Sequence, residues 1–438
     1  MPRILTVTFA GLLALLLHLP APGWAQDKKP GDPKPPDKEV EKKLDPKDLK
    51  GKGGKVPRPT GLRKYEDVIT TEAKTSKGIF TVHRIEDKIY FEIPEAAYGK
   101  YFLWMAEVAK ASSGAGWGGK ALGNRVVRWA RRGNKVLLWQ ASFEKRSDGR
   151  AIERAVESAD LASLLMSFNI ETEGKDKSAV IAVNSLFTSD AGLVNGPSGI
   201  GESFVEELRA FPTNIETRLM LNFRGGAGGG VPMGPPGPGR FGGGGKASTM
   251  VVHYSMTLLP DQPMRGRYFD SRVGYFTRSF EDYSGTKDWM QRKEYIARFR
   301  LEKKDPKAAL SEPIKPIVFY LSREVPEKWR PYLMKGVEDW KPAFEKAGFK
   351  NAIICKQAPT VKEDPTWDPE DARYSVIRWV ADPTMNAMGP HVHDPRSGEI
   401  ISAHVIFWHN ITKLAQQWYF VQCGGSDPRA HKLPLPDD

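Results

Sequence analysis

Apolar residues recur at every second position in much of the chain from about Tyr65 to Lys304. This two-residue alternation is typical of β-strands with one buried face. Three clear rows run from Ile89 to Ile93, from Ile215 to Phe223 and from Met250 to Leu258. We therefore predict a twisted antiparallel β domain in this region.

Two features add detail to that β domain. The apolar runs Val126 to Trp129 and Val136 to Trp139 bracket Arg132-Gly133-Asn134, a sequence typical of a hairpin turn. In the row that ends at Phe223, polar residues such as Glu216 alternate with the apolar ones. These polar residues are predicted to face away from the core.

The pattern changes after Asp305. Residues Ile317 to Leu321 form a short apolar run that predicts a buried strand. A helix is predicted next, because apolar residues then recur at spacings of three and four up to a stop at Gly348: Trp329, Leu333, Val337, Trp340 and Phe344. Pro342 is expected to kink this helix.

The remaining C-terminal elements are predicted to be three strands and a last helix. The strands are expected at Ala352 to Cys355, Tyr374 to Val380 and Glu399 to Phe407. The helix is expected to begin at Asn410, a good N-cap residue, and to run through Trp418 and Phe420.

The N-terminus has the three parts of a cleavable signal peptide. Arg3 gives the positive start, Leu12 to Leu17 the apolar run, and Gly23-Trp24-Ala25 the small-residue exit. The apolar run is shorter than the roughly 20 residues of a membrane-spanning helix. We predict that residues 1–25 are removed and that the protein is secreted or periplasmic.

Two segments have compositions that do not support a packed core. Residues 26–64 are rich in Lys, Pro, Asp and Gly, which predicts a disordered linker. Residues 225–246 are a run of Gly and Pro without a three-residue period, which predicts a flexible loop and excludes collagen. The net charge of +12 is partly concentrated in the linker, so we expect contact with the cell envelope there and no nucleic-acid binding.

The chain has two cysteines, Cys355 and Cys423. An oxidising compartment permits a disulfide between them, but two buried free thiols fit the sequence equally well. Two cysteines alone do not form a zinc site.

Several segments in the C-terminal part resemble a known family. They are Arg378-Trp379, Ala387 to Pro390, Asp394 to Ile400, Ala403 to Ile406 and Asp427 to Ala430. They are similar to the segment that precedes the zinc helix in large bacterial secreted zinc-dependent metallopeptidases of metzincin type. The β-rich region is similar to the N-terminal domains of unknown function of that family.

The resemblance implies a fold and a metal. The fold is α+β: an N-terminal antiparallel β-rich domain (65–304, with the loop 225–246) followed by the upper half of a zincin-like α+β catalytic domain (305–438). Such enzymes hold zinc with an HExxHxxGxxH motif, whose Glu is the general base. No His in this sequence is followed by Glu, so the chain is expected to be truncated before the motif and inactive as given.

The resemblance also implies a substrate-binding strand. In metzincin-like enzymes the strand that borders the cleft pairs with an extended peptide through its backbone. That place falls on Ser402, Ala403, His404, Val405 and Ile406, although an ordinary edge strand fits the same pattern. No catalytic residue or metal ligand is assigned in this chain, and zinc is expected only in the complete protein.

The histidines near this strand suggest a local metal site as a less favoured alternative. His391 and His393 share a face if extended, and His404 and His409 follow closely. Zinc would accept three of them, but no carboxylate spacing supports the cluster.

Two functional hypotheses follow from the sequence. In the first, the chain is the N-terminal portion of a secreted zinc-dependent metalloendopeptidase that acts on a peptide or protein substrate. In the second, it is a non-enzymatic secreted protein that binds peptides or the cell envelope.

Overall fold

The computed structural model describes residues 61–112, 120–147, 151–159, 162–189, 193–194, 200–223, 248–284, 289–381 and 384–429. All of these belong to one compact unit, Pro59–Asp438. The predicted signal peptide (1–25), the predicted linker up to residue 60 and the Gly/Pro-rich loop (225–246) lie outside the described residues.

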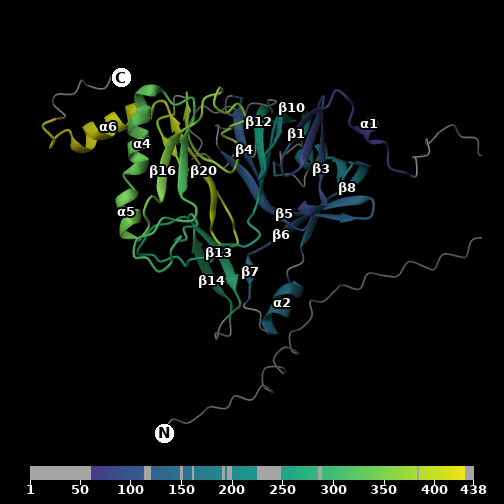
Figure 1. Ribbon diagram of the computed structural model, residues 1–438, viewed down its shortest axis with the longest axis horizontal. Coiled ribbons are helices and arrows are strands. Elements are labelled where there is room, and N and C mark those ends of the chain that lie inside the picture. The colour runs from purple at the N-terminus through teal and green to yellow at the C-terminus, as the bar shows by residue number, and fades with distance from the viewer. Residues whose placement is uncertain are drawn as a thin grey trace, which may run out of the picture. The chain divides into compact units, whose positions relative to one another are not determined.

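The dominant element is an antiparallel sheet, which we call the rolled sheet (Figure 1). In the described residues it has 11 strands, in the order β1-β2-β3-β9-β8-β6-β5-β4-β12-β11-β10. Their bounds are β1 (Lys74–Lys77), β2 (Thr81–Ile85), β3 (Lys88–Ile93), β4 (Tyr101–Ala111), β5 (Ala121–Arg132), β6 (Lys135–Ala141), β8 (Ser163–Glu173), β9 (Ala179–Ala182), β10 (Ile200–Ala210), β11 (Asn214–Phe223) and β12 (Ser248–Leu258).

The first and last strands of this sheet approach each other. The hydroxyl of Ser76 on β1 accepts a hydrogen bond from the backbone N–H of Ala210 on β10 at 3.0 Å. Just beyond these strands, the N–H of Ile79 donates to the carbonyl of Phe211 at 2.8 Å. The sheet is therefore almost closed on itself.

Large aromatic side chains fill the inside of the rolled sheet. Trp129 is completely buried and its ring contacts those of Phe80, Phe91 and Phe168. Burial of such rings is the main source of stability for a domain of this kind. The predicted antiparallel β domain is confirmed, and its three predicted rows are β3, β11 and β12.

The predicted hairpin is also confirmed. Strands β5 and β6 pair in antiparallel register, with Arg132 opposite Lys135. Gly133 in the two-residue turn has φ of +57°, a left-handed conformation that glycine adopts without steric cost.

Smaller elements surround the rolled sheet. A second sheet has the order β14-β13-β7. The bounds of these elements are α1 (Tyr65–Val68), η1 (Glu95–Ala97), β7 (Lys145–Arg146), α2 (Ala151–Ala159), α3 (Asn184–Thr188), β13 (Thr277–Asp282) and β14 (Gln291–Ile296).

The C-terminal part forms a third, mixed sheet with the order β16-β15-β17-β20-β18. Strands β16, β15, β17 and β20 are parallel, whereas β18 and β19 run antiparallel to β20. The bounds are β15 (Ile317–Leu321), β16 (Ile353–Gln357), β17 (Ser375–Val380), β18 (Ala387–Met388), β19 (His391–His393) and β20 (Ile400–Trp408).

Helices accompany this mixed sheet: η2 (Glu327–Trp329), α4 (Arg330–Glu338), α5 (Lys341–Lys346) and α6 (Ile411–Cys423). Helix α4 covers one face, where its Leu333, Met334 and Val337 pack against buried Leu321 and Ile377 of the strands. Among the described residues, no helix is both long enough and apolar enough to span a membrane.

The single kinked helix predicted from Trp329 to Phe344 is in fact two helices. Helix α4 ends at Glu338, and α5 starts at Lys341 with Pro342 in its first turn. Proline lacks the N–H for an interior helical hydrogen bond but is well tolerated in a first turn, so the break falls just before it. The predicted stop at Gly348 is confirmed by its φ of +88°.

The fold is therefore mostly β, with mixed sheets and a few helices towards the C-terminus, and it is α+β only in this broad sense. Cys355 is buried and Cys423 is partly buried, and both are free thiols, so the disulfide alternative is not the one found. Burial raises the pKa of the Cys355 thiol to about 11, which keeps it protonated and unreactive.

Candidate functional site

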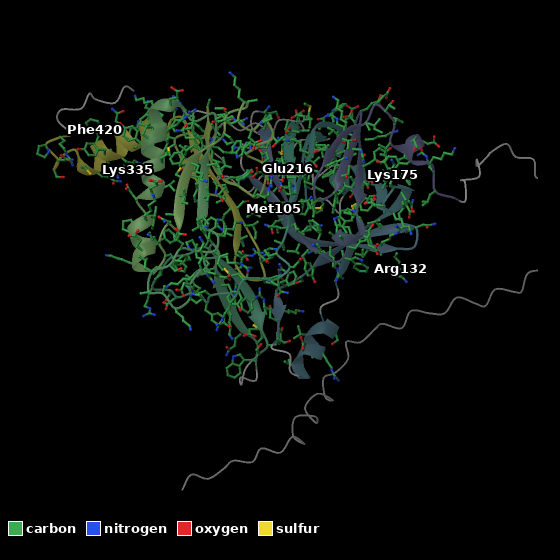
Figure 2. The ribbon with its side chains drawn as sticks, in the orientation of Figure 1. Met105, Arg132, Lys175, Glu216, Lys335 and Phe420 are labelled. Carbon is green, nitrogen blue, oxygen red and sulfur yellow. The ribbon has the colours of Figure 1, made fainter. Side chains whose placement is uncertain are left out.

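A cluster of ionisable side chains lies where the rolled sheet meets the C-terminal sheet. Glu216 on β11, His253 on β12 and Glu370, in the loop before β17, are 4%, 7% and 3% exposed. One nitrogen or oxygen from each of the three lies within 4.8 Å of the others. Figure 2 shows Glu216 and Met105 on the side of the rolled sheet that faces the C-terminal sheet.

Strand register explains how these side chains meet. Across three neighbouring strands, Glu107 on β4 lies opposite His253, which lies opposite Arg218 on β11. Glu216 is in the adjacent row, opposite Ser255. Residues directly opposite in an antiparallel pair share a face. The polar positions of β11 and β12 therefore gather on the outer face of the rolled sheet, and the C-terminal part covers this face.

The imidazole of His253 is held between carboxylates. Its Nδ1 lies 3.2 Å from Oε1 of Glu107, and its Nε2 lies 2.6 Å from Oε2 of Glu216 and 3.6 Å from Oε2 of Glu370. Burial by itself would lower the pKa of His253, but the hydrogen bonds to Glu107 and Glu216 raise it to about 10. His253 is therefore a cation that donates from both nitrogens.

Two arginines hold Glu370. Arg218 donates to its Oε1 at 2.6 Å, and Arg378 on β17 lies 3.0 Å from the same oxygen. Burial by itself would raise the pKa of Glu370, but the positive charges of His253 and Arg378 hold the pKa far below its usual range. Glu370 is therefore ionised although it is buried.

Asn214 fastens the loop of Glu370 to β11. Its side-chain amide donates to Oε1 of Glu216 at 2.5 Å and to the backbone carbonyl of Glu370 at 2.9 Å. Its amide oxygen accepts from the backbone N–H of Ala372 at 3.0 Å. Asn214 is fully buried, so these three bonds replace the water that it loses on folding.

The charges of the cluster balance. Three carboxylates face three cations: Glu107, Glu216 and Glu370 against His253, Arg218 and Arg378. Zinc requires a neutral imidazole nitrogen with a free lone pair, but both nitrogens of His253 are engaged with carboxylates. The cluster as it stands is a buried ion-pair network, and Glu216, His253 and Glu370 could hold a metal once Nε2 of His253 loses its proton.

A cavity of about 220 Å³ adjoins this network. Both halves of the chain contribute to its wall, including Met105 and Glu107 from β4 and Ser402, His404 and Ile406 from β20. Three of the five residues predicted to bind substrate therefore face one cavity. Val405, another of the five, packs against the hydrophobic cluster that contains Leu321 and Ile377, on the α4 side of the sheet.

The prediction that Ser402 to Ile406 form an edge strand is wrong. On one side β20 pairs with β17, where Val376 lies opposite His404. On the other side it pairs with β19, where Val392 lies opposite Ser402. Within the described residues, β18 and β19 form the edge of this sheet that lies beyond β20, and β16 forms the opposite edge. We call the edge formed by β18 and β19 the outer edge. These strands escaped prediction because they have only two and three residues and Pro390 lies between them.

The four histidines in or near β18 to β20, His391, His393, His404 and His409, do not form a metal site in the described residues. The rings of His391 and His393 are 5.1 Å apart between centroids. Among the described residues, the group of side chains that could hold a metal is Glu216, His253 and Glu370, and it contains none of these four histidines. Burial lowers the pKa of His391 and His404, and lowers that of His393 to about 4.

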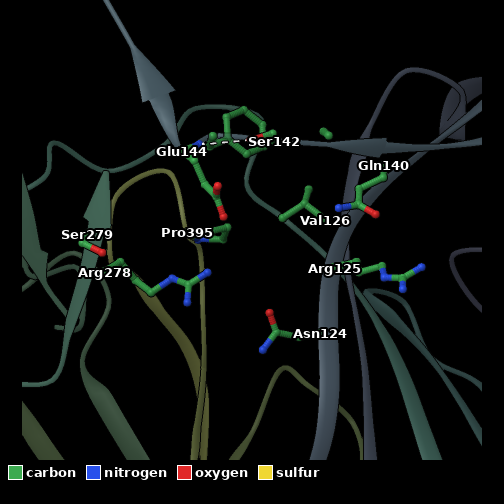
Figure 3. Close-up of a pocket in the computed structure, with 11 residues that line it drawn as sticks. Asn124, Arg125, Val126, Gln140, Ser142, Glu144, Arg278, Ser279 and Pro395 are labelled. Carbon is green, nitrogen blue, oxygen red and sulfur yellow. Dashed lines mark hydrogen bonds between the residues drawn. The ribbon is translucent and has the colours of Figure 1, made fainter. Parts of the chain in front are cut away.

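A second hollow, of about 180 Å³, lies beside the first and shares Asn124 with it. Figure 3 shows Glu144 and Arg278 pointing into it, with Pro395 between them. The backbone N–H of Glu144 donates to the hydroxyl of Ser142 at 3.3 Å. None of the described side chains that line this hollow has a buried polar atom without a partner, so this hollow gives no sign of a missing ligand.

Comparison with known proteins identifies two domains in the chain. Residues 62–111 match the model of a domain of unknown function (DUF5118). Residues 119–304 match that of another domain of unknown function (DUF5117). The chain thus contains both domains.

Together the two domains cover the region predicted as the β-rich accessory domain. No curated protein and no solved structure matches the chain.

Part of the ion-pair network could be anticipated from a local pattern. Glu216 is a polar residue in the alternating row of β11 and was expected to face away from the core, as it does, but its cover by the C-terminal part was not expected. Glu370 lies in a loop without periodicity, and its meeting with Arg218 joins positions 152 residues apart. Such a contact follows from tertiary packing and leaves no local pattern.

Proposed function

We propose that this chain is the N-terminal portion of a secreted zinc-dependent metallopeptidase. The observation that carries the proposal is the layout of the C-terminal sheet. Four parallel strands are bordered by antiparallel β18 and β19, and α4 packs on one face. This layout supports a comparison with the upper half of a zincin-like catalytic domain, which the resemblance of Arg378 to Ile406 suggests.

The outer edge of β18 and β19 is the place proposed for the substrate. A strand at the edge of a sheet presents backbone N–H and C=O groups to an extended peptide. This replaces Ser402 to Ile406, whose backbone groups are already flanked by strands on both sides.

Zinc belongs to the proposed complete protein and not to the residues given. The HExxHxxGxxH motif is absent from this sequence. When bound by such a motif, zinc supplies Lewis-acid activation of the scissile carbonyl. The proposed role of this chain is to form one wall of the cleft and to orient the peptide.

The test compares this chain with a longer form that includes the residues encoded after Asp438. We expect the longer form to contain zinc by elemental analysis and to hydrolyse casein, with both properties lost after treatment with a chelator. The chain as given is the matched control, and we expect neither property from it. A longer form that neither binds zinc nor hydrolyses casein would contradict the proposal.

A non-enzymatic secreted protein that binds peptides or the cell envelope is the second candidate. The outer edge of β18 and β19 favours it as much as the enzyme, because strand addition needs no catalytic group. Binding of an extended peptide by the longer form without any hydrolysis would support this candidate.

A further inference from the structure

Two buried nitrogens in the wall of the 220 Å³ cavity lack hydrogen-bond partners. These are Nε2 of His391 and Nε2 of His404, and both residues line the cavity. A buried polar atom without a partner costs roughly 1–3 kcal/mol, so native proteins normally satisfy such atoms. The cavity is therefore built for an occupant that makes hydrogen bonds.

The protonation of these two imidazole rings indicates which kind of group would bind to the nitrogens. The His391 ring is already hydrogen-bonded to the backbone of Gly389, and burial lowers the pKa of this histidine. In a neutral imidazole that donates from one nitrogen, the other carries a bare lone pair. Nε2 of His391 is thus an acceptor, and His404, which burial also keeps neutral, accepts at Nε2 in its Nδ1–H tautomer.

A carboxylate at the same cavity adds negative charge. The side chain of Glu107 is 45% exposed. Burial by itself would raise the pKa of Glu107, but the hydrogen bond from His253 lowers it, so the group is ionised. His253 uses one of the roughly four acceptor positions of this carboxylate.

Glu107 is the carboxylate of the lining that has room for a further partner. The described charged residues of the lining are Glu107, Glu216, Glu370, His253 and Arg378. Glu216 and Glu370 are almost fully buried and already bound within the ion-pair network, and burial raises the pKa of Glu216. A ligand with a positively charged donor would therefore pair with Glu107.

Apolar side chains form another part of the wall. Met105, Val392 and Ile406 line the cavity on different strands. A site of this kind favours a ligand with an aliphatic body and disfavours a hydrated divalent cation. An anion would be repelled by the carboxylate of Glu107.

We infer that the cavity binds a small organic monocation, an ammonium group on a short aliphatic chain. The ammonium donates hydrogen bonds to Glu107 and to the histidine nitrogens, and the aliphatic chain packs against Met105, Val392 and Ile406. This inference is independent of the proposed peptidase activity, because the cavity is formed by described residues and involves no zinc.

Two sources share this chemistry: a free alkylamine and the lysine side chain of a peptide. The probes are n-pentylamine, which is charged at neutral pH, n-pentanol as its uncharged match, and Nα-acetyl-lysine methylamide. Calorimetry on the full chain should detect the amine, with the alcohol at least about tenfold weaker. Tighter binding of the lysine derivative than of pentylamine assigns the site to a peptide side chain, and the reverse order assigns it to a free amine.

Three variants test the position of the site. Glu107→Gln should weaken pentylamine binding by about tenfold. Ala121→Phe, at an exposed alanine in the cavity wall, should block binding by filling the space. Glu144→Gln is the matched control, because this exposed carboxylate lines only the neighbouring hollow, and binding should be unchanged within about twofold.

The inference is overturned if pentanol binds as well as pentylamine, if neither amine binds, or if Ala121→Phe binds as the natural chain does. Circular dichroism checks that each variant is folded. Should Glu107→Gln fail to fold, Ala121→Phe together with the alcohol comparison decides the matter, because the alcohol is compared on the natural chain and Ala121→Phe removes no charged group of the ion-pair network.

Discussion

The Nε2 atom of His253 on β12 lies 2.6 Å from Oε2 of Glu216 on β11, in a position that is almost fully buried. The pair is part of a network that joins the outer face of the rolled sheet to the loop of Glu370. A buried ion pair is not by itself strongly stabilising, but removal of one partner leaves an uncompensated charge. Removal of the charge of one member of this network should therefore lower the stability of the protein.

The stability of the protein should fall at alkaline pH because of His253. Its pKa rises from 6.5 to about 10 on folding. A raised pKa contributes stability that is fully present below about pH 6.5 and is lost as the pH rises through about 10. We expect the free energy of unfolding to fall by on the order of 5 kcal/mol over this window.

Urea denaturation at several pH values measures this loss. His253→Gln, which cannot become charged, is the comparison, and its stability should depend much less on pH between 6.5 and 10. An equally steep alkaline loss in this variant would show that His253 is not the responsible group.

Replacement of Glu370 by Gln should destabilise the protein by about 3 kcal/mol, because Arg218 and Arg378 would lose their shared carboxylate. Chemical denaturation followed by tryptophan fluorescence provides the measurement. Glu345→Gln, at an exposed position on α5, is the matched control and should change stability by less than about 0.5 kcal/mol. Equal effects of the two substitutions would contradict the network.

Zinc should not stabilise the chain as given. Metal binding to the native state raises the melting temperature in proportion to its affinity, but both nitrogens of His253 are bound to carboxylates and Glu370 is already paired with Arg218 and Arg378. Melting curves with stoichiometric zinc and with EDTA should therefore coincide. A dose-dependent rise that EDTA reverses would mean that a metal site exists in these residues.

Gly398 should tolerate alanine much less well than Gly133 does. Both have positive φ, at +76° and +57°. A Cβ at Gly398 would lie 2.3 Å from the backbone oxygen of Ile296, whereas at Gly133 it would meet nothing within 4 Å. We expect Gly133→Ala to cost about 1 kcal/mol, and Gly398→Ala to cost several times more, as measured by urea denaturation. Similar losses at both sites would argue against the close approach to Ile296.

Sequence reasoning was most successful where one face of a strand is apolar. The rows ending at Ile93, Phe223 and Leu258 were predicted because their side chains alternate, and each is a strand. It failed where tertiary packing decides the environment. Glu216 faces away from the core of the rolled sheet as expected, but no pattern in the sequence showed that a segment some 150 residues later covers it.

The surroundings of His404 in the candidate cavity also depend on tertiary packing that the sequence does not reveal. His404 was selected from the sequence for a backbone role in an edge strand, whereas the structure suggests a role for its side chain. The residues that line the cavity with that side chain, such as Glu107 and Met105, come from the opposite half of the chain, and no spacing in the sequence links them. The five-residue segment contributes Ser402, His404 and Ile406 to the wall of this cavity.

The long separation between Arg218 and Glu370 has a consequence for how the protein matures. Synthesis proceeds from the N-terminus, so β11 and β12 emerge well before Glu370. Until that residue arrives, the charged outer face of the rolled sheet is hydrated and lacks its counterpart. The last stage of folding is thus a docking of distant segments, which is intrinsically slow and leaves the newly synthesised chain exposed to proteolysis until it is complete.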